Sequence, residues 1–168
     1  MIRPIEERDI SKCLEIYNYY VKNTTATFEC SKISFDDFKS RANRISQKFP
    51  YFVCEIDNAI VGYAYLDYFI EREAAFMSAD LSIYVDHSQR GKKIGGLLLA
   101  NIIKVASNYG IKNIISVVTT DNIASMKFHE KNGFHKKGEV NDIACKLDKS
   151  LGVIYYKLEL WKDVAGVI

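Results

Sequence analysis

A short segment, SQRGKKIGGLLL at residues 88–99, mixes basic residues with glycines and leads directly into leucines. Glycine is a poor helix former, and crowded positive charges repel one another, so this composition indicates a site that a negatively charged group approaches. A helix that begins here would present unpaired N–H groups and about half a positive charge. Glycines would let an anion come close to those donors. The segment therefore suits a phosphate or a pyrophosphate.

Two familiar phosphate-binding patterns do not fit this segment. A P-loop requires Lys and then Ser or Thr after its last glycine, whereas Leu97 follows Gly96. The dinucleotide pattern G-x-G-x-x-G is absent as well. The structural alternative is a charged surface loop that precedes an ordinary helix and binds nothing.

The elements that must position this loop follow from hydrophobic periodicity and turn residues. Helical spacing of apolar residues predicts helices over 9–21, with Asp9 as N-cap, 34–47, 94–109 and 122–131. Alternating or continuous apolar runs predict strands over 2–5, 51–56, 59–70, 75–85, 113–119, 134–140 and 153–160. Asp57-Asn58 predicts a hairpin turn. The expected fold class is a mixed α/β sheet with helices on its faces.

Length and composition limit the classes of function. The chain has 168 residues and a formal net charge of +2, which favours a single domain over residues 1–168 and does not suggest a nucleic-acid partner. The charged N-terminus lacks the apolar core of a signal peptide, and no apolar run reaches the ~20 residues of a membrane span. The four cysteines are scattered, which predicts reduced thiols in the cytoplasm and no metal site.

The segment VDHSQRGKKIGGLLL at 85–99 resembles the acetyl-CoA-binding segment of the GNAT acetyltransferase superfamily, whose pattern Q/R-x-x-G-x-G/A follows a strand. Arg90 opens this pattern and Gly95 is its last glycine, whereas Lys93 replaces the middle glycine. The segments IRPIEERDISKCLEIYNYYVKNTTATFE and SMKFHEKNGF are similar to the phosphinothricin acetyltransferase-like branch, so the resemblance covers about residues 2–140. It implies the GNAT fold, with a central, mostly antiparallel sheet, acetyl-CoA as cofactor and a homodimer.

The resemblance also implies which residues hold the cofactor. Backbone amides of about Gly91 to Gly96 would hold the pyrophosphate, and an N–H at Val85 would stabilise the oxyanion near the thioester. Asn122 would contact the pantetheine arm, with capping of the following helix as its structural role. The complete set implied for coenzyme A is Tyr84, Val85, Arg90, Gly91, Lys92, Lys93, Ile94, Gly95, Gly96, Asn122, Ser125 and Phe128.

Acetyl transfer to an amine requires a base, because an alkylammonium has a pKa near 10. In the phosphinothricin-type branch a glutamate on this strand is proposed as the base, and the segment DLSIYV places Asp80 there. The Asp side chain is shorter by about 1.5 Å, so a relaying water could be needed. Burial beside the thioester should raise the pKa of Asp80. The alternative is a solvated carboxylate on an exposed strand face.

His129 is the second catalytic candidate. The wider superfamily commonly has a tyrosine at this position, taken to protonate the leaving thiolate, whereas the phosphinothricin-type branch has histidine. A neutral imidazole N–H could donate to the sulfur, whose unperturbed thiol pKa is about 8.5. The structural alternative is a histidine that only packs on a short helix.

The acceptor side is less well defined by the sequence. The loop TTATFE would form one wall of the acceptor pocket, with Phe28, Glu29 and Asp80 as substrate-binding residues and a core position as the alternative for Phe28. Past about residue 140 the likeness weakens: Lys146 matches the branch, but its usual tyrosine, tryptophan and aspartate are replaced by Cys145, Ser150 and Gly152. This segment helps to form the acceptor pocket in that branch, so the resemblance does not fix the acceptor.

The expected function is an acetyl-CoA-dependent N-acetyltransferase that modifies a primary amine of a small molecule, such as an amino acid or a compound like phosphinothricin or methionine sulfoximine. Direct transfer in a ternary complex is favoured, because none of the cysteines lies in a segment expected beside the thioester. The alternatives are acetylation of a protein N-terminus or lysine, and a non-catalytic module that binds acyl-CoA.

Overall fold

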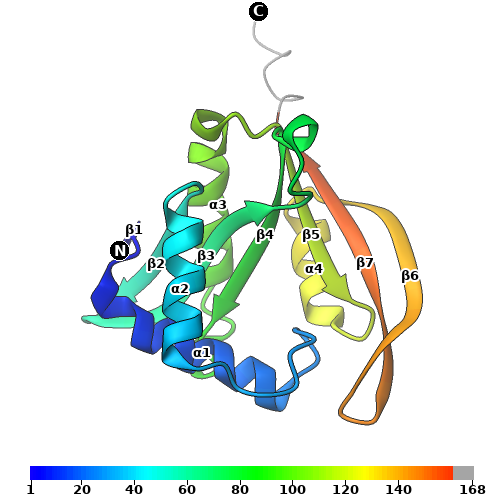
Figure 1. The fold of residues 1–168 in the computed structure, drawn as a ribbon, viewed down its shortest axis with the longest axis horizontal. Coiled ribbons are helices and arrows are strands. Elements are labelled where there is room, and N and C mark those ends of the chain that lie inside the picture. The colour runs from blue at the N-terminus through cyan, green and yellow to red at the C-terminus, as the bar shows by residue number, and fades with distance from the viewer. Residues whose placement is uncertain (161–168) are drawn as a thin grey trace, which may run out of the picture.

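A seven-stranded sheet runs through the molecule (Figure 1). The computed structural model describes residues 1–160, so the end of the expected domain, 161–168, lies outside the described residues. The strands are β1 (Ile2–Pro4), β2 (Tyr51–Ile56), β3 (Ala59–Tyr68), β4 (Ser78–Val85), β5 (Asn113–Thr119), β6 (His135–Lys146) and β7 (Lys149–Glu159). Their order is β1-β2-β3-β4-β5-β7-β6, and every neighbouring pair is antiparallel except β4 and β5. The predicted mixed, mostly antiparallel sheet is confirmed.

Helices cover both faces of this sheet (Figure 1). They are α1 (Ile10–Asn23), α2 (Phe35–Ser46), α3 (Ile94–Ala106) and α4 (Ile123–Lys131). On one face, Tyr17 of α1 packs edge-on against Tyr84 of β4, and Phe38 of α2 packs against Tyr63 of β3. On the other face lie α3 and α4. Within residues 1–160, no helix is both long and apolar enough to span a bilayer.

Most predicted boundaries depend on local turn chemistry and are confirmed. Asp57 and Asn58 both adopt positive φ angles, as a two-residue hairpin turn requires. The Asn122 side chain accepts the Ser125 N–H at 3.2 Å and caps α4. Gly133 takes a left-handed conformation after α4, and Gly110 does so after the 3-10 turn that follows α3.

Several predictions about the helices and strands were wrong, including the strand 59–70, which ends at Tyr68. Asp9 does not cap α1, because its carboxylate accepts hydrogen bonds from the Glu6 N–H and from Nη1 and Nη2 of Arg3. The α-helical part of 94–109 ends at Ala106, and a 3-10 turn follows, which leaves Tyr109 exposed. The expected strand 75–85 begins only at Ser78, after another 3-10 turn.

The hairpin of β6 and β7 is longer than predicted. Its turn residues, Leu147 and Asp148, both have positive φ angles, although neither is the Asn or Gly that signals such a turn. The pairing register also shifts between Val140 and Ala144, and Asp142 in this bulge has a positive φ. A bulge interrupts the alternation of side chains, which explains why the sequence pattern ended the strand at 140.

Gly152 of β7 has no space for a side chain. A Cβ there would lie 2.3 Å from the Val140 carbonyl oxygen and 2.8 Å from the Asn141 Cα, both backbone atoms of the bulge in β6. We therefore expect Gly152→Ala to lower the free energy of unfolding by about 1–3 kcal/mol. Gly138→Ala is the matched control, because a Cβ at Gly138 meets nothing within 4 Å. Equal thermal unfolding of the two variants would contradict this packing.

The strands β4 and β5 diverge. Their parallel pairing is confined to positions 78–80 of β4 and 113–115 of β5. Beyond Asp80 and Ile115 each strand continues toward its C-terminal end without pairing with the other, and Figure 1 shows the space between them widening. Asp80 thus lies where the two strands separate.

Candidate active site

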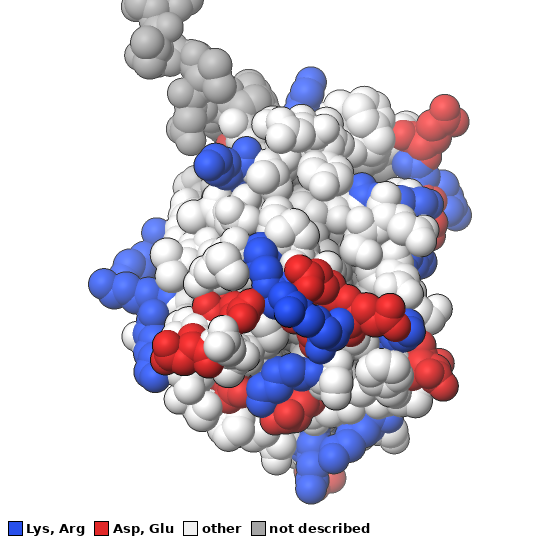
Figure 2. Space-filling view, turned by 90° about the vertical axis from the view of Figure 1, so that its left-hand side faces the viewer, with Lys and Arg blue, Asp and Glu red and all other residues white. Residues whose placement is uncertain are grey.

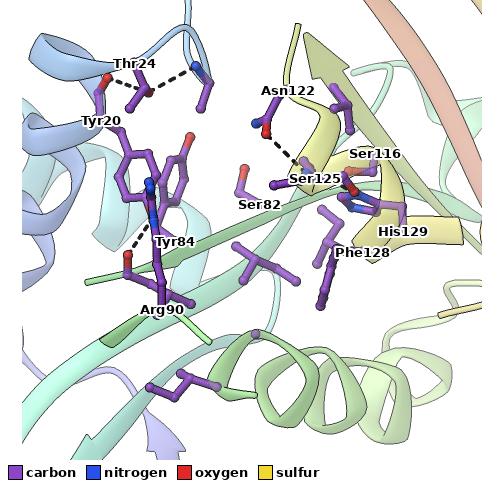
Figure 3. Close-up of a pocket in the computed structure, with 18 of the residues that line it drawn as sticks. Tyr20, Thr24, Ser82, Tyr84, Arg90, Ser116, Asn122, Ser125, Phe128 and His129 are labelled. Atoms are coloured by element: carbon purple, nitrogen blue, oxygen red, sulfur yellow. Dashed lines mark hydrogen bonds between the residues drawn. The ribbon is translucent and has the colours of Figure 1, made fainter. Parts of the chain in front are cut away.

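A cavity of about 660 Å³ opens where β4 and β5 separate (Figure 3). It brings together most of the residues predicted from the sequence: Asp80, Tyr84, Val85, Arg90, Gly91, Lys93, Ile94, Gly95, Gly96, Asn122, Ser125, Phe128 and His129. Lys92, Phe28 and Glu29 do not line it. Thr24, Thr25 and Ala26 of the predicted loop TTATFE line it as well. Sequence reasoning missed Tyr20, Ser82, Ser116 and Asp121, which also form its walls.

The N-terminus of α3 is an open anion site at one end of this cavity. Its N-cap residue, Lys93, makes no capping hydrogen bond with its side chain, so the N–H groups of the first turn remain available. A Cβ at Gly96 would meet nothing within 4 Å, whereas one at Gly95 would touch the Phe128 ring at 3.4 Å. These features fit the diphosphate of a nucleotide cofactor.

Lys93 has a left-handed backbone conformation, with φ of 62°. This conformation has a steric cost for every residue except glycine, which explains why the family pattern has a glycine at this position. Gly91 also has a positive φ, of 80°. The loop therefore keeps the shape that glycines would favour even though a lysine occupies one position.

Arg90 and Tyr20 join this loop to α1. The Arg90 guanidinium carbon lies 5.2 Å from the centre of the Tyr20 ring, a cation–π contact that Figure 3 shows. The Tyr20 hydroxyl donates to the Val85 carbonyl oxygen at 2.6 Å. Nothing in the helical spacing of 10–23 distinguishes Tyr20 from a packing residue, because only the fold brings α1 to the end of β4.

The backbone of β4 offers hydrogen-bonding groups to the cavity. Asp86 N–H donates to the Val61 carbonyl of β3, while the preceding residue, Val85, pairs with Gly62. Because antiparallel pairs alternate, the N–H of Val85 is directed away from β3, toward the space between β4 and β5. An N–H in this orientation can serve as the oxyanion donor that the resemblance implies at Val85.

Asp80 lies at the narrow end of the cavity with one carboxylate oxygen, Oδ1, buried and without a hydrogen-bond partner among the described residues. The pKa of Asp80 is raised to about 7, first by burial and next by the neighbouring Asp67 carboxylate, while the Leu81 N–H opposes both. The alternative of a solvated carboxylate on an exposed face is wrong. A carboxyl group with a pKa near neutrality is suited to general base catalysis.

His129 is buried, and its ring lies nearly parallel to that of Tyr156 and edge-on to that of Phe134. Its Nδ1 lies 2.8 Å from the Ser125 carbonyl oxygen (Figure 3). A carbonyl can only accept, so Nδ1 carries the proton and Nε2 of the neutral ring has a lone pair. Burial lowers the pKa of His129. The N–H expected to meet the sulfur is thus directed at the backbone instead.

The loop between α1 and α2 crosses the α1 side of the cavity. Thr25 donates to Asp121, in the turn before α4, at 2.6 Å. Thr27 accepts from Lys146 of β6 through its carbonyl oxygen at 2.7 Å. Phe28 is 40% exposed, so the alternative that it fills the core is wrong.

Glu29 follows Phe28 in this loop and is held by Arg41 of α2. The distance from Arg41 Nη2 to Glu29 Oε1 is 2.7 Å, whereas Glu29 Oε2 is buried without a hydrogen-bond partner among the described residues. Burial raises the pKa of Tyr84, and the charges of Asp80 and Glu29 are among those that raise it further. In the cavity itself, a ligand with an N–H donor could satisfy the free Oδ1 of Asp80.

Curated relatives match nearly the whole chain. A phosphinothricin N-acetyltransferase from Streptomyces viridochromogenes is 24% identical over 145 residues, which cover 86% of this chain and 79% of the relative. An L-methionine sulfoximine/L-methionine sulfone acetyltransferase from Pseudomonas paraeruginosa is 28% identical over 164 residues, which cover 95% and 94% of the two chains.

Solved structures share the fold. An N-acetyltransferase from Staphylococcus aureus Mu50 has a TM-score of 0.92 at 31% identity, covering 95% of this chain and 98% of its own. A phosphinothricin acetyltransferase from Sinorhizobium meliloti, solved in complex with AcCoA, has a TM-score of 0.91 at 27% identity, covering 95% and 87%. A ribosomal-protein-alanine N-acetyltransferase from Brucella melitensis has a TM-score of 0.89 at 30% identity, covering 95% and 99%.

The family described as acetyltransferase (GNAT) domain matches residues 2–149, which include every strand and helix that forms the cavity. The open helix N-terminus, the diverging strands and the buried carboxylate all lie within this range. The chain therefore belongs to the GNAT family of N-acetyltransferases.

Proposed function

We propose that the chain transfers the acetyl group of acetyl-CoA to the primary amine of a small molecule, such as an amino acid or a compound like phosphinothricin or methionine sulfoximine. The observation that carries this proposal is the single cavity that connects the open N-terminus of α3 with the buried Asp80 carboxylate. The named substrates of the two curated relatives support the substrate class.

The cofactor would lie along the cavity, with its diphosphate against the first turn of α3 and its pantetheine arm between β4 and β5. Bound acetyl-CoA would supply the acetyl group as a thioester. Arg90 would add positive charge at the diphosphate end, and the Val85 N–H would donate to the oxygen that becomes negative during transfer. Asn122 would keep its capping role while facing the arm. The exposed Lys92, whose ammonium donates to Gln89 at 2.7 Å, would contribute only charge.

Asp80 would take the proton of the attacking amine. Its unpartnered Oδ1 can accept a hydrogen bond directly from an ammonium group or from one intervening water. Direct transfer in a ternary complex is supported by the positions of the cysteines, since none of the four lines this cavity. A carboxylate whose only task was structural would be expected to have hydrogen-bond partners for both oxygens.

His129 would protonate the leaving thiolate only after Nε2 takes up a proton, because its Nδ1 proton is held by Ser125. The lowered pKa of His129 makes the resulting imidazolium a better acid toward a thiolate. The neutral ring would otherwise act by accepting a hydrogen bond through Nε2. His129 is thus proposed as a proton carrier and not as a permanent donor.

The acceptor would enter from the side of α1 and α2, past the loop that carries Phe28 and Glu29 and whose residues Thr24, Thr25 and Ala26 line the cavity. The loop that carries them is bonded to the turn before α4 and to β6, which favours a compact acceptor over an extended peptide. Acetylation of a protein N-terminus is the second candidate, supported by the structural likeness to the Brucella enzyme.

A thiol-release assay with a panel of amines tests the proposed function. We expect release of coenzyme A with one or more free amino acids or their sulfoximine, sulfone or phosphinate analogues, and little release with peptides that begin with alanine. Preference for the peptides would support the second candidate. Absence of release across the whole panel would contradict both and leave a binding module without turnover.

The proposal also covers the oligomeric state, the cellular location and the partners of the enzyme. A homodimer is proposed from family analogy, and a cytoplasmic location from the four free cysteines. No nucleic-acid partner is proposed. Figure 2 supports this for the face beside the N-terminus, where basic and acidic side chains lie intermixed.

A further inference from the structure

A second cavity, of about 350 Å³, lies behind the loop that crosses the active site. It is enclosed by the end of α1, that loop and the tip of the hairpin β6–β7. Its walls are Val21, Lys22, Cys30, Lys32, Cys145, Lys146, Leu147 and Asp148. None of these residues lines the larger cavity, so the two are separate sites.

The side chain of Lys146 makes this cavity unusual. Lys146 is only 6% exposed, and its ammonium donates to one neutral acceptor, the Thr27 carbonyl oxygen, at 2.7 Å. Of the residues in 1–160, no carboxylate lies within 4.0 Å of this nitrogen. The ammonium has three N–H donors, and a buried charge without a counter-ion is costly.

The nearest acidic groups do not supply the missing counter-ion. Glu29 acts on Lys146 electrostatically, but from beyond ion-pair distance, and its carboxylate is already bound to Arg41 at 2.7 Å. Cys30 also acts on Lys146 and is a free thiol. Asp148 is the one carboxylate in the cavity wall, against three lysines.

We propose that this cavity binds a small oxyanion, a phosphate or a carboxylate, which serves as the counter-ion of Lys146. Lys22 and Lys32, both exposed at the cavity wall, supply the further positive charge that attracts and holds it. The site is independent of the proposed transfer reaction, because it needs neither the cofactor cavity nor Asp80. It shares only the loop around Thr27 with the acceptor side.

Two cysteines in the cavity wall report directly on its occupancy. Cys30 and Cys145 are exposed and free, whereas Cys13 and Cys54 are buried in the core. Alkylation by iodoacetamide, an uncharged reagent, can be followed at each cysteine by mass spectrometry. Sodium phosphate and sodium citrate are compared with sodium chloride at equal ionic strength, so that screening of the lysines is the same in every sample.

We expect phosphate, citrate or both to slow alkylation of Cys30 and Cys145 in a saturable manner, by about tenfold at ten times the dissociation constant. Protection by one salt alone would identify the oxyanion as a phosphate or a carboxylate. Lys146→Met should abolish the protection. Lys32→Gln, on an exposed and structurally tolerant side chain, should weaken it by about 3–10-fold in apparent affinity.

Lys104→Gln is the charge-matched control, because Lys104 lies on α3 away from this cavity and should leave protection unchanged. Equal alkylation rates in all three salts would overturn the proposal. Protection that persists unchanged in Lys32→Gln and Lys146→Met would overturn it as well, since binding would then not involve these lysines.

Discussion

Asp80→Asn is expected to lower kcat/KM for the amine by about 10²–10⁴-fold while coenzyme A still binds. The amide keeps the shape of the side chain but cannot accept the amine proton. Thiol release measures the first effect, and calorimetric titration of coenzyme A measures the second. Asp80→Glu is the matched control, because it retains a carboxylate and restores the length that the related enzymes have. Wild-type rates in Asp80→Asn would exclude Asp80 as the base.

The pH dependence of the same variants separates a base from a structural carboxylate. Because burial raises the pKa of Asp80 to about 7, wild-type kcat/KM should rise with pH up to about 7 and then level off. Asp80→Asn should lack this rise.

The raised pKa of Asp80 also means that folding favours the protonated form, so ionisation of Asp80 destabilises the protein as pH rises from about 4 to 7. Asp80→Asn should therefore unfold at a higher temperature than wild type at pH 8, and at the same temperature near pH 4.

Gly96→Glu is expected to raise the Kd for coenzyme A by about 100-fold, equivalent to about 2.7 kcal/mol. Gly96 lies in the first turn of α3, and a side chain there would extend into open space instead of meeting other atoms. A carboxylate at this position would satisfy the helix N-terminus and repel the diphosphate. The same carboxylate favours the helix, so the unfolding temperature should not fall. Titration calorimetry and thermal unfolding measure the two effects.

Two controls accompany this substitution. Gly96→Ala adds a Cβ without charge and should change the Kd by less than about threefold. Lys104→Glu introduces a carboxylate farther along α3 and should leave the Kd unchanged within the same limit. Coenzyme A binding to Gly96→Glu with wild-type affinity would show that the diphosphate is not held at this helix end.

The sequence predicted the parts of the fold that depend on local chemistry. Asp57-Asn58 and Asn122 fix a turn and a helix start within a few residues, so their effects could be predicted from the sequence. The extension of β6 and β7 could not be predicted, because a bulge and the unusual turn at Leu147-Asp148 interrupt the pattern. Asp9 was misread because its partner, Arg3, lies on another element.

The same distinction holds for the candidate site: its contiguous segments were predicted, and its contacts between distant residues were not. The loop around Gly91 to Gly96 is contiguous in the sequence, and its position at the start of α3 is confirmed. Tyr20 is separated from Val85 by 65 positions, so only the packing of α1 against β4 brings them into contact. The raised pKa of Asp80 likewise depends on burial within the fold and on the charge of Asp67 on the neighbouring strand.

The divergence of β4 and β5 has a consequence for the cooperativity of unfolding. The backbone pairing that joins β1–β4 to β5–β7 is limited to positions 78–80 and 113–115. Such a narrow junction allows one half of a sheet to open before the other, at a lower free energy than global unfolding. A cofactor that spans the two strands joins both halves and suppresses this opening in proportion to its binding free energy. In this protein the molecule that supplies the acyl group would also hold the two halves of the sheet together.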